Sequence, residues 1–335
     1  MDSVTHVVLG ACIGEICIGK KTGRRALFLG ALAQSIPDID FIATFWTTPT
    51  RDLLAHRGFT HSILFILLTT PILAWLAHRW RRPHDVAFRT WLWFFALELF
   101  VHLALDTANA YGTGWLEPFS HDRFSYHALF VADPLFTLFP LIAFIILLFF
   151  RRHRRREQWA AFAICWSAVY LVFGLLNKAV IERDVQQIAK EKGIEWRRHF
   201  TTPTPLNILL WYVVMEDDKG YHIGHRSVFD SKPAMDFKYF PRNDSLLMPV
   251  KDLDELKDLF RFSQGYYTIE RTGDTLVFND LRFGQMAGWH HPGAGFVFHY
   301  YLQQPYSNNM VVQRGRFANW NKAVLLSMWR RIKGN

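Results

Sequence analysis

The residues best suited to chemistry are two histidines in residues 56–62, a segment that reads HRGFTHS. On one continuous helix His56 and His61 would point about 140° apart, because five residues turn the chain through about 500°. Gly58 lies between them and can break a helix, which lets His56 fold back from a loop. Thr60 is a reasonable N-cap for the apolar run that follows, and this places His61 in the first turn of that helix. We therefore expect both imidazoles to face one point.

Two further groups of polar side chains lie at the ends of other apolar runs. His102 and Asp106 are four residues apart and would share one helix face, which Glu98 continues one turn deeper. Ionisable side chains inside a membrane span are costly and are candidates for function. The alternative is a buried hydrogen-bonded pair that ties helices together, and we expect Glu98 to lie behind the ligands or to be structural. Asp38 and Asp40 form the third group, where at least one carboxylate could bind metal or both could simply stop a helix.

Three more histidines complete the set: His6 near the N-terminus, and His121 and His127 in an aromatic loop, each of which could also be an ordinary surface residue. Imidazole and carboxylate without thiolate suit zinc, manganese or iron better than a sulfur-rich structural site does. The candidates outnumber the ligands of one four-coordinate zinc. Two or three divalent ions could therefore bind, with zinc favoured over manganese. The expected metal ligands are His6, Asp40, His56, His61, His102, Asp106, His121 and His127, and the expected catalytic residues are Asp38, Asp40 and Arg57.

Six apolar segments must position these side chains: residues 4–19, 25–45, 61–78, 90–110, 131–150 and 158–181. A spanning helix needs about 20 residues, and the third, fifth and sixth segments are the clearest. Basic residues cluster in every second connection, at 20–25, 79–89 and 151–156, and the positive-inside rule places these connections in the cytoplasm. The N-terminus, the C-terminal half and all the candidate ligands then lie on the outer side of the membrane.

Two smaller patterns predict local structure in this half of the chain. Asp133 precedes a proline, as an N-cap followed by proline at the first helical position does. Its carboxylate therefore has a structural explanation besides metal binding. Gly10 and Gly14 form a small-xxx-small face, which is typical of close packing between helices.

The composition argues against a nucleic-acid-binding protein. The net charge is +9, but the basic residues lie in short clusters between apolar runs, whereas nucleic-acid binding needs a basic face on a folded surface. The three cysteines, Cys12, Cys17 and Cys165, all fall inside apolar runs and are expected to be buried thiols rather than ligands or disulfides. The first six residues lack a positive n-region, so we expect no cleavable signal peptide.

The second half of the chain has the composition of a soluble domain. Turn signals at 217–220 and 271–274 lie between strand-like stretches and predict two hairpins. Residues 252–262 and 320–332 are predicted to form amphipathic helices, and the second carries late basic residues and could lie on a membrane. We predict a polytopic α-helical membrane domain of about six spans, residues 1–182, followed by a small α+β extracytoplasmic domain, residues 183–335.

The motifs together resemble the YdjM-type family, whose members are described as LexA-regulated, membrane-bound metal-dependent hydrolases. The likeness covers about residues 1–180 and rests on His6 with a glycine-rich first helix, PDID at 37–40, HRGFTHS at 56–62 and HLALD at 102–106. Residues 280–283 (DLRF) also look like a segment of longer members. More distantly, the order of His and Asp residues is similar to the zinc-dependent phospholipase C and P1-type nuclease group, which binds three zinc ions. His102 and Asp106 match the HxxxD pattern of that group, but no clear HxxxE follows.

The resemblance implies a membrane-embedded metal-dependent hydrolase of the bacterial inner membrane. A divalent metal would activate water against an ester or phosphoester, and the membrane setting favours a lipid or lipid-linked substrate at the outer face. A guanidinium suits a phosphate through forked hydrogen bonds, although Arg57 could equally be a loop arginine that contacts lipid headgroups. One alternative is an ion-coupled transporter with Glu15, Glu98 and His102 in its path, and another is a non-catalytic sensor or scaffold with a structural metal. The polar residues lie mostly at one end, which weighs against transport.

Overall fold

The structure, a computed structural model, describes residues 1–80, 86–150, 155–231, 234–250, 253–302, 317 and 320–334. The chain divides into two compact units: Met1–Ala43 with Ala55–Gly174, and Thr44–Leu54 with Leu175–Asn335. The later division falls inside one long helix, α7 (Arg156–Glu191), between Gly174 and Leu175. Five arginines of the predicted cytoplasmic loops lie outside the described residues: Arg81, Arg82, Arg151, Arg152 and Arg154.

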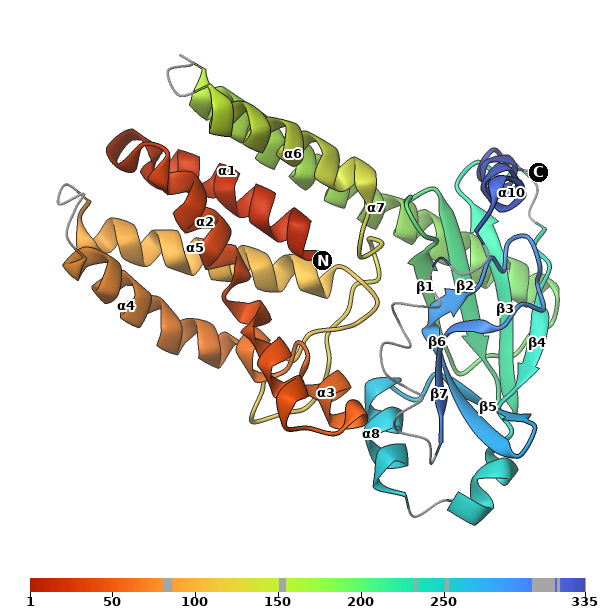
Figure 1. Ribbon diagram of the computed structural model, residues 1–335. Helices are drawn as coiled ribbons and strands as arrows, with labels where there is room; N and C mark the ends of the chain where they lie inside the picture. Colours follow the sequence, from red (N-terminus) through yellow and green to blue (C-terminus); the bar gives the residue numbers. More distant parts are fainter. Residues whose placement is uncertain are drawn as a thin grey trace. The chain divides into compact units, whose positions relative to one another are not determined.

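The first unit is helical, and in it α1 packs against α2, α5 and α6 (Figure 1). Its helices are α1 (Ser3–Thr22), α2 (Arg25–Ser35), α4 (Ile63–Arg79), α5 (Phe88–Thr107), α6 (Pro134–Phe149) and the first part of α7. Three helices, α1, α5 and α7, are long and apolar enough to cross a membrane. Two bent pairs of helices could each form one further span, which raises the number to five. These pairs are α2 with η1 (Pro37–Phe45), and Pro49–His61 with α4. The described residues thus offer three to five spans, where the sequence suggested about six.

Glycines let α1 and α2 approach closely. A side chain at Gly14 would clash with the carbonyl oxygen of Ala26, and one at Gly30 would clash with the carbonyl oxygen of Gly10. The prediction that Gly10 and Gly14 serve helix packing is confirmed. This close approach brings the C-terminal end of α2, and the 3-10 helix η1 that follows it, against the bundle.

Proline and capping residues set the helix ends near the candidate site. The Asp133 carboxylate accepts from the backbone N–H groups of Leu135 and Phe136, which confirms the predicted N-cap of α6. The predicted cap of α4 was wrong. Ser62 caps this helix through the N–H of Phe65, and Thr60 lies in a 3-10 turn, η2 (Phe59–His61), because the backbone is still too tightly coiled there to begin an α-helix.

The second unit contains two antiparallel sheets. One has the order β1-β2-β3-β4, formed by Arg198–Pro203, Leu210–Glu216, Gly220–Ser227 and Lys238–Pro241. The other has the order β5-β6-β7, formed by Tyr267–Thr272, Thr275–Gln285 and Phe296–Tyr301. Both predicted hairpins are present, β2-β3 and β5-β6, and Asp217 closes the first by accepting from the N–H groups of Lys219 and Gly220.

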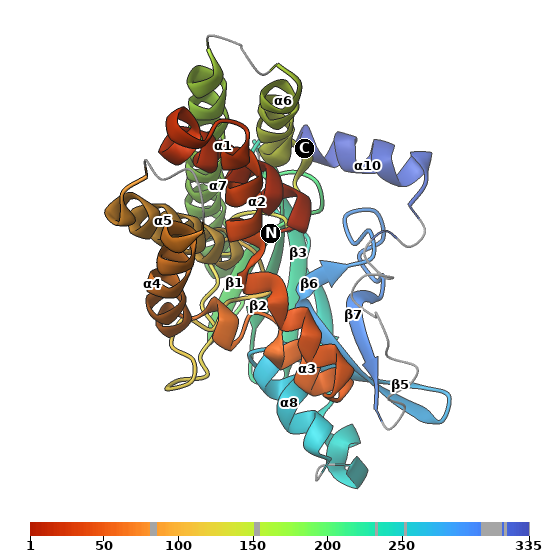
Figure 2. The ribbon, with the colours of Figure 1, turned by 60° about the vertical axis from the view of Figure 1, so that its left-hand side comes forward.

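Helices cover parts of these sheets. Ile181, Val185 and Ile188 of α7 pack on Trp211 and Val213 of β2. The short helix α3 (Pro49–Ala55) lies beside α8 (Asp254–Phe262), where the Thr50 hydroxyl donates to Asp258 at 2.9 Å (Figure 2). The last helix, α10 (Lys322–Ile332), confirms the predicted terminal amphipathic helix.

All three cysteines are free, as expected, but they are not all buried. Cys12 is buried between helices, whereas Cys165 is exposed on α7. The expectation of burial fails for Cys165 because a helix long and apolar enough to cross a bilayer can turn apolar side chains toward lipid rather than toward protein.

Candidate metal centre

Four side chains from three separate segments converge in the first unit. Asp38 of η1, His61 of η2 and His102 and Asp106 of α5 each offer one ligand atom, and these four atoms lie within 4.8 Å of one another. The two Nε2 atoms of His61 and His102 are 3.0 Å apart. The Asp106 Oδ2 atom is 3.1 Å from the first and 3.3 Å from the second, and Asp38 Oδ1 is 3.6 Å from both.

Hydrogen bonds behind the two rings fix which nitrogen faces the centre. The Nδ1 atom of His102 lies 2.5 Å from the main-chain oxygen of Gln34, which can only accept, so Nδ1 carries the proton and Nε2 presents its lone pair. The hydrogen-bond partner of His61 Nδ1 is the Thr60 hydroxyl at 3.0 Å, and Asp40 Oδ2 lies 3.4 Å from the same nitrogen. A carbonyl or carboxylate behind an imidazole is the usual support of a metal-binding histidine.

The arrangement fits a divalent cation. Two imidazole lone pairs that face each other at 3.0 Å repel unless a proton or a metal ion lies between them. Asp106 Oδ2 is buried and has no hydrogen-bond partner among the described residues. An ion bound by both nitrogens and this oxygen would satisfy all three atoms. Two nitrogens and two oxygens are a donor set that suits a divalent metal ion.

Burial differs across the four side chains. His61, His102 and Asp106 are essentially inaccessible, whereas the Asp38 side chain is 29% exposed. The centre therefore opens on the Asp38 side. A closed structural zinc site has four protein ligands and no accessible position, while a catalytic site keeps one open for water or substrate.

Asp40 lies behind the centre and joins two of the histidines. Its Oδ2 atom accepts from the N–H of Arg57 at 2.7 Å and faces His61, and its Oδ1 atom is 3.3 Å from Nδ1 of His56. The His56 side chain is 41% exposed. The structure thus places Asp40 and His56 next to the group of four and not within it.

Arg57 and His6 surround the other oxygen of Asp106. The Arg57 guanidinium lies 3.2 Å from Asp106 Oδ1 and donates to Asn109 Oδ1 at 2.7 Å. His6 Nε2 lies 3.2 Å from the same Asp106 oxygen, the His6 ring stacks on His102 at 3.9 Å, and the amino group of Met1 also contacts this oxygen. Arg57 is 3% exposed, so it does not contact lipid headgroups.

The structure does not bring the two loop histidines into the group of four. His121 is 60% exposed and pairs with Glu117 at 2.8 Å. His127 has a positive φ of 48° in the loop that follows α5. Neighbouring main-chain bonds from Tyr126 to Thr107 and from Ala128 to Ala108 hold this loop against the end of that helix.

Gln34 and Asn109 were missed by the sequence reasoning. Gln34 holds His102 through its main-chain oxygen, and its side-chain oxygen lies 3.3 Å from His6 Nδ1. A lone amide four residues before Asp38, inside an apolar run, was the available signal for Gln34.

Glu98 is fully buried one turn below His102, and neither of its oxygens has a hydrogen-bond partner among the described residues.

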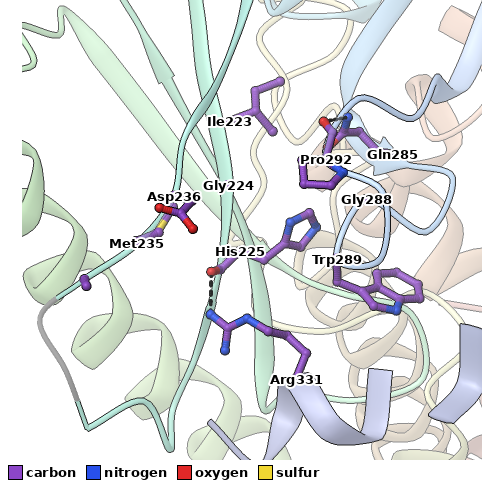
Figure 3. Close-up of a pocket in the computed structure, with 11 residues that line it drawn as sticks. Ile223, Gly224, His225, Met235, Asp236, Gln285, Gly288, Trp289, Pro292 and Arg331 are labelled. Atoms are coloured by element: carbon purple, nitrogen blue, oxygen red, sulfur yellow. Dashed lines mark hydrogen bonds between the residues drawn. The ribbon is translucent and has the colours of Figure 1, made fainter. Parts of the chain in front are cut away.

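The second unit has a cavity of its own, with a volume of about 210 Å³ (Figure 3). His225, Asp236, Trp289 and Arg331 are among the residues that line it. Burial and the charge of Arg331 lower the pKa of His225 to about 3, so its imidazole is neutral at physiological pH. Within the described residues, the group suited to a metal ion lies in the first unit.

The helices and the His/Asp group define an α-helical membrane protein with a possible metal site between its helices. A family model described as YdjM inner membrane protein matches residues 1–181, which is more than half of the chain, and the protein belongs to this family. The match ends within α7, so most of the second unit lies beyond it.

Two relatives support this assignment. Inner membrane protein YbcI of Escherichia coli (strain K12) is 33% identical over 123 residues, which are 36% of this chain and 69% of that protein. Uncharacterized protein YfhP of Bacillus subtilis (strain 168) is 31% identical over 153 residues, 44% of this chain and 46% of that protein. The chain thus spans about half the length of YfhP. No solved structure matches the chain.

Proposed function

We propose that the protein is a metal-dependent hydrolase of the bacterial inner membrane, acting on an ester or phosphoester of a lipid or lipid-linked substrate at the outer face. The observation that carries the proposal is the pair of Nε2 atoms on His61 and His102, which face each other at 3.0 Å beside a buried carboxylate oxygen without a hydrogen-bond partner among the described residues. When bound, a divalent ion lowers the pKa of a water molecule and polarises the bond to be cut.

The chain's own residues take distinct roles in this proposal. His61, His102 and Asp106 would hold the ion, and Asp38, which borders the open side, would complete its ligands until water or substrate takes that position. Asp40 orients His61, and through the half-exposed His56 it forms a pair that can take a proton from the attacking water. Arg57 and His6 balance the charge of Asp106 from the side away from substrate.

Ion number and metal follow from the ligands. The described residues contain one group of four ligand atoms, which suits one ion. A second or third ion, as the sequence count suggested, would need Asp40 or the histidines around it to change partners. We therefore propose one zinc ion, with manganese as the weaker alternative.

A non-catalytic sensor with a structural metal is the main alternative, and the partial exposure of Asp38 favours catalysis over it. The transporter alternative is weakened by Glu15, whose carboxylate forms two 2.7 Å bonds to Arg156 and so is engaged by an ion pair.

The experiment starts from purified protein in lipid nanodiscs. Metal content should be about one ion per chain and should be lost in a combined His102→Ala and Asp106→Ala variant, but not in Cys165→Ser, a control on an exposed apolar surface. The loaded protein is then incubated with phospholipid and isoprenoid-linked pools, and products are followed by mass spectrometry. Hydrolysis should stop with chelator and return with zinc. Metal binding without any metal-dependent product would refute the hydrolase and favour the sensor.

The proposed orientation has its own test. A reporter fused after residue 335 should read as extracytoplasmic, because the basic connections alternate with that polarity. A cytoplasmic reading would place the metal centre on the inner face and exclude an outer-leaflet substrate.

A further inference from the structure

Helix α10 of the second unit has one face packed on the protein and an apolar face that is left open. Val324 and Ile332 are buried, whereas Leu325 and Leu326 are each 45% exposed and Trp329 is 56% exposed. At 100° per residue these three exposed side chains lie on one side of the helix. Three large apolar side chains together on a solvent-facing helix are unusual for a soluble surface and typical of an interaction site.

The helix is held firmly in this orientation. The Arg331 guanidinium donates to both oxygens of Asp230 at 2.6 and 2.7 Å, and to the main-chain oxygen of His225 at 2.8 Å, a bond marked in Figure 3. The Ser227 hydroxyl donates to the main-chain oxygen of Ile332 at 2.5 Å. Because these contacts fix the packed face against β3 and the loop that follows it, the open face cannot turn inward without breaking them.

The charged side chains of α10 and its C-cap Lys333 are all positive. Lys322 and Lys333 lie on the side of the open face at the two ends of the helix, Arg330 flanks this face, and the Lys333 ammonium is 5.5 Å from the centre of the Trp329 ring. Residues 301–335 contain no Asp or Glu. Apolar side chains bordered by tryptophan and lysine match a membrane interface, where lysine stems cover apolar surface and their charges reach phosphate groups.

A chain of ion pairs connects α10 to α7. Arg331 binds Asp230, Asp230 lies 3.7 Å from Arg226, and Arg226 lies 3.0 Å from Asp184 of α7. On α7 the exposed apolar side chains of the second unit end at Val180, and Asp184 follows about 6 Å further along the helix. The C-terminal turn of α10 is thus linked to α7 about one turn beyond the exposed apolar surface of α7.

We propose that α10 is an interfacial helix through which the second unit docks on the anionic surface of the bilayer that holds the first unit. Leu325, Leu326 and Trp329 enter the headgroup region, and Lys322, Arg330 and Lys333 bind lipid phosphates. The charge pattern favours a bilayer over a second copy of the chain, because two copies of this surface would bring like charges together. The docking does not depend on the metal centre or on hydrolysis.

The test uses the full chain in nanodiscs that contain phosphatidylglycerol. A photoreactive residue is placed in the open face by Leu326→p-benzoylphenylalanine, the sample is irradiated, and adducts are identified by mass spectrometry. The expected main product is a chain joined to phospholipid. The matched control carries the same probe at Met248, which is 69% exposed in the same unit and should give little lipid adduct. A chain-to-chain adduct as the main product, or lipid adduct no greater than in the control, would overturn the proposal.

A second measurement tests the charge. Lys322→Glu with Lys333→Glu changes two exposed side chains without touching the packed face, so folding should be retained and checked by the thermal midpoint. Each lysine near an anionic surface strengthens binding about fivefold, and we expect the lipid adduct to fall by at least this factor. Replacing phosphatidylglycerol by phosphatidylcholine should have a similar effect. A yield unchanged by both treatments would refute docking on anionic lipid.

Discussion

Asp40→Asn is the substitution that most directly tests the role of the side chains behind the metal centre. Asparagine keeps the size of the side chain and one carbonyl oxygen, so the 2.7 Å bond from the Arg57 N–H can survive. The asparagine NH2 group cannot accept a hydrogen bond, and the side chain carries no charge. The Nδ1 atoms of His61 and His56, which each face one oxygen of the Asp40 carboxylate, can therefore no longer both face an acceptor. Loss of such a supporting partner weakens metal binding about 10- to 100-fold, which is about 1.4–2.7 kcal/mol.

The assay is competition for zinc between the protein in nanodiscs and a chelating dye. Asp122→Asn is the matched control, because Asp122 is an exposed carboxylate that accepts from Ser120 in a loop, and its affinity should equal that of the parent. The metal-free thermal midpoint shows whether Asp40→Asn still folds. Unchanged zinc affinity in Asp40→Asn, together with lost binding in His102→Ala, would refute the inference that Asp40 supports His61 as a ligand.

Three further outcomes are expected. His121→Ala should leave metal content unchanged in elemental analysis, because this exposed ring lies outside the group of four; a loss would show that the loop rearranges to bind metal. Asp133→Ala should lower the free energy of unfolding by about 1–2 kcal/mol through loss of the α6 cap, and Asp133→Asn should restore most of it; equal midpoints for all three chains would contradict the capping role. Gly30→Ala should lower the free energy of unfolding by about 1–3 kcal/mol, because the new methyl group would meet the carbonyl oxygen of Gly10. The control Gly293→Ala meets nothing within 4 Å, and its thermal midpoint should equal that of the parent.

The segments that meet at the centre could be predicted because their positions follow from simple periodicities. His102 and Asp106 share a face of α5 by their spacing, and the ends of apolar runs bring Asp38 and His61 to the same level. The α-helical nature of the first half and the sheets of the second follow from patterns of the same kind. Whether these residues bind metal stays a prediction.

The division of roles within the site could not be predicted from spacing. Asp40 faces Nδ1 of His61 rather than Nε2 because Arg57 takes a left-handed conformation, with φ of 59°, and turns its N–H toward that carboxylate. A non-glycine residue rarely adopts this conformation, and the sequence pointed instead to Gly58 as the flexible position. The support of His102 by a main-chain oxygen of Gln34 depends on how closely α2 and α5 pack, which no single segment reveals.

The two oxygens of Asp106 have different neighbours, and this bears on how the protein is made in the cell. Oδ1 is surrounded by Arg57, His6 and the amino group of Met1, while Oδ2 faces the candidate ion position. A buried carboxylate needs a compensating charge before the helices around it can assemble, and here the chain supplies that charge itself. Membrane insertion and helix assembly can therefore precede metal acquisition. If the group of four binds an ion as proposed, that ion would enter after assembly, through the opening beside the partly exposed Asp38, rather than during synthesis.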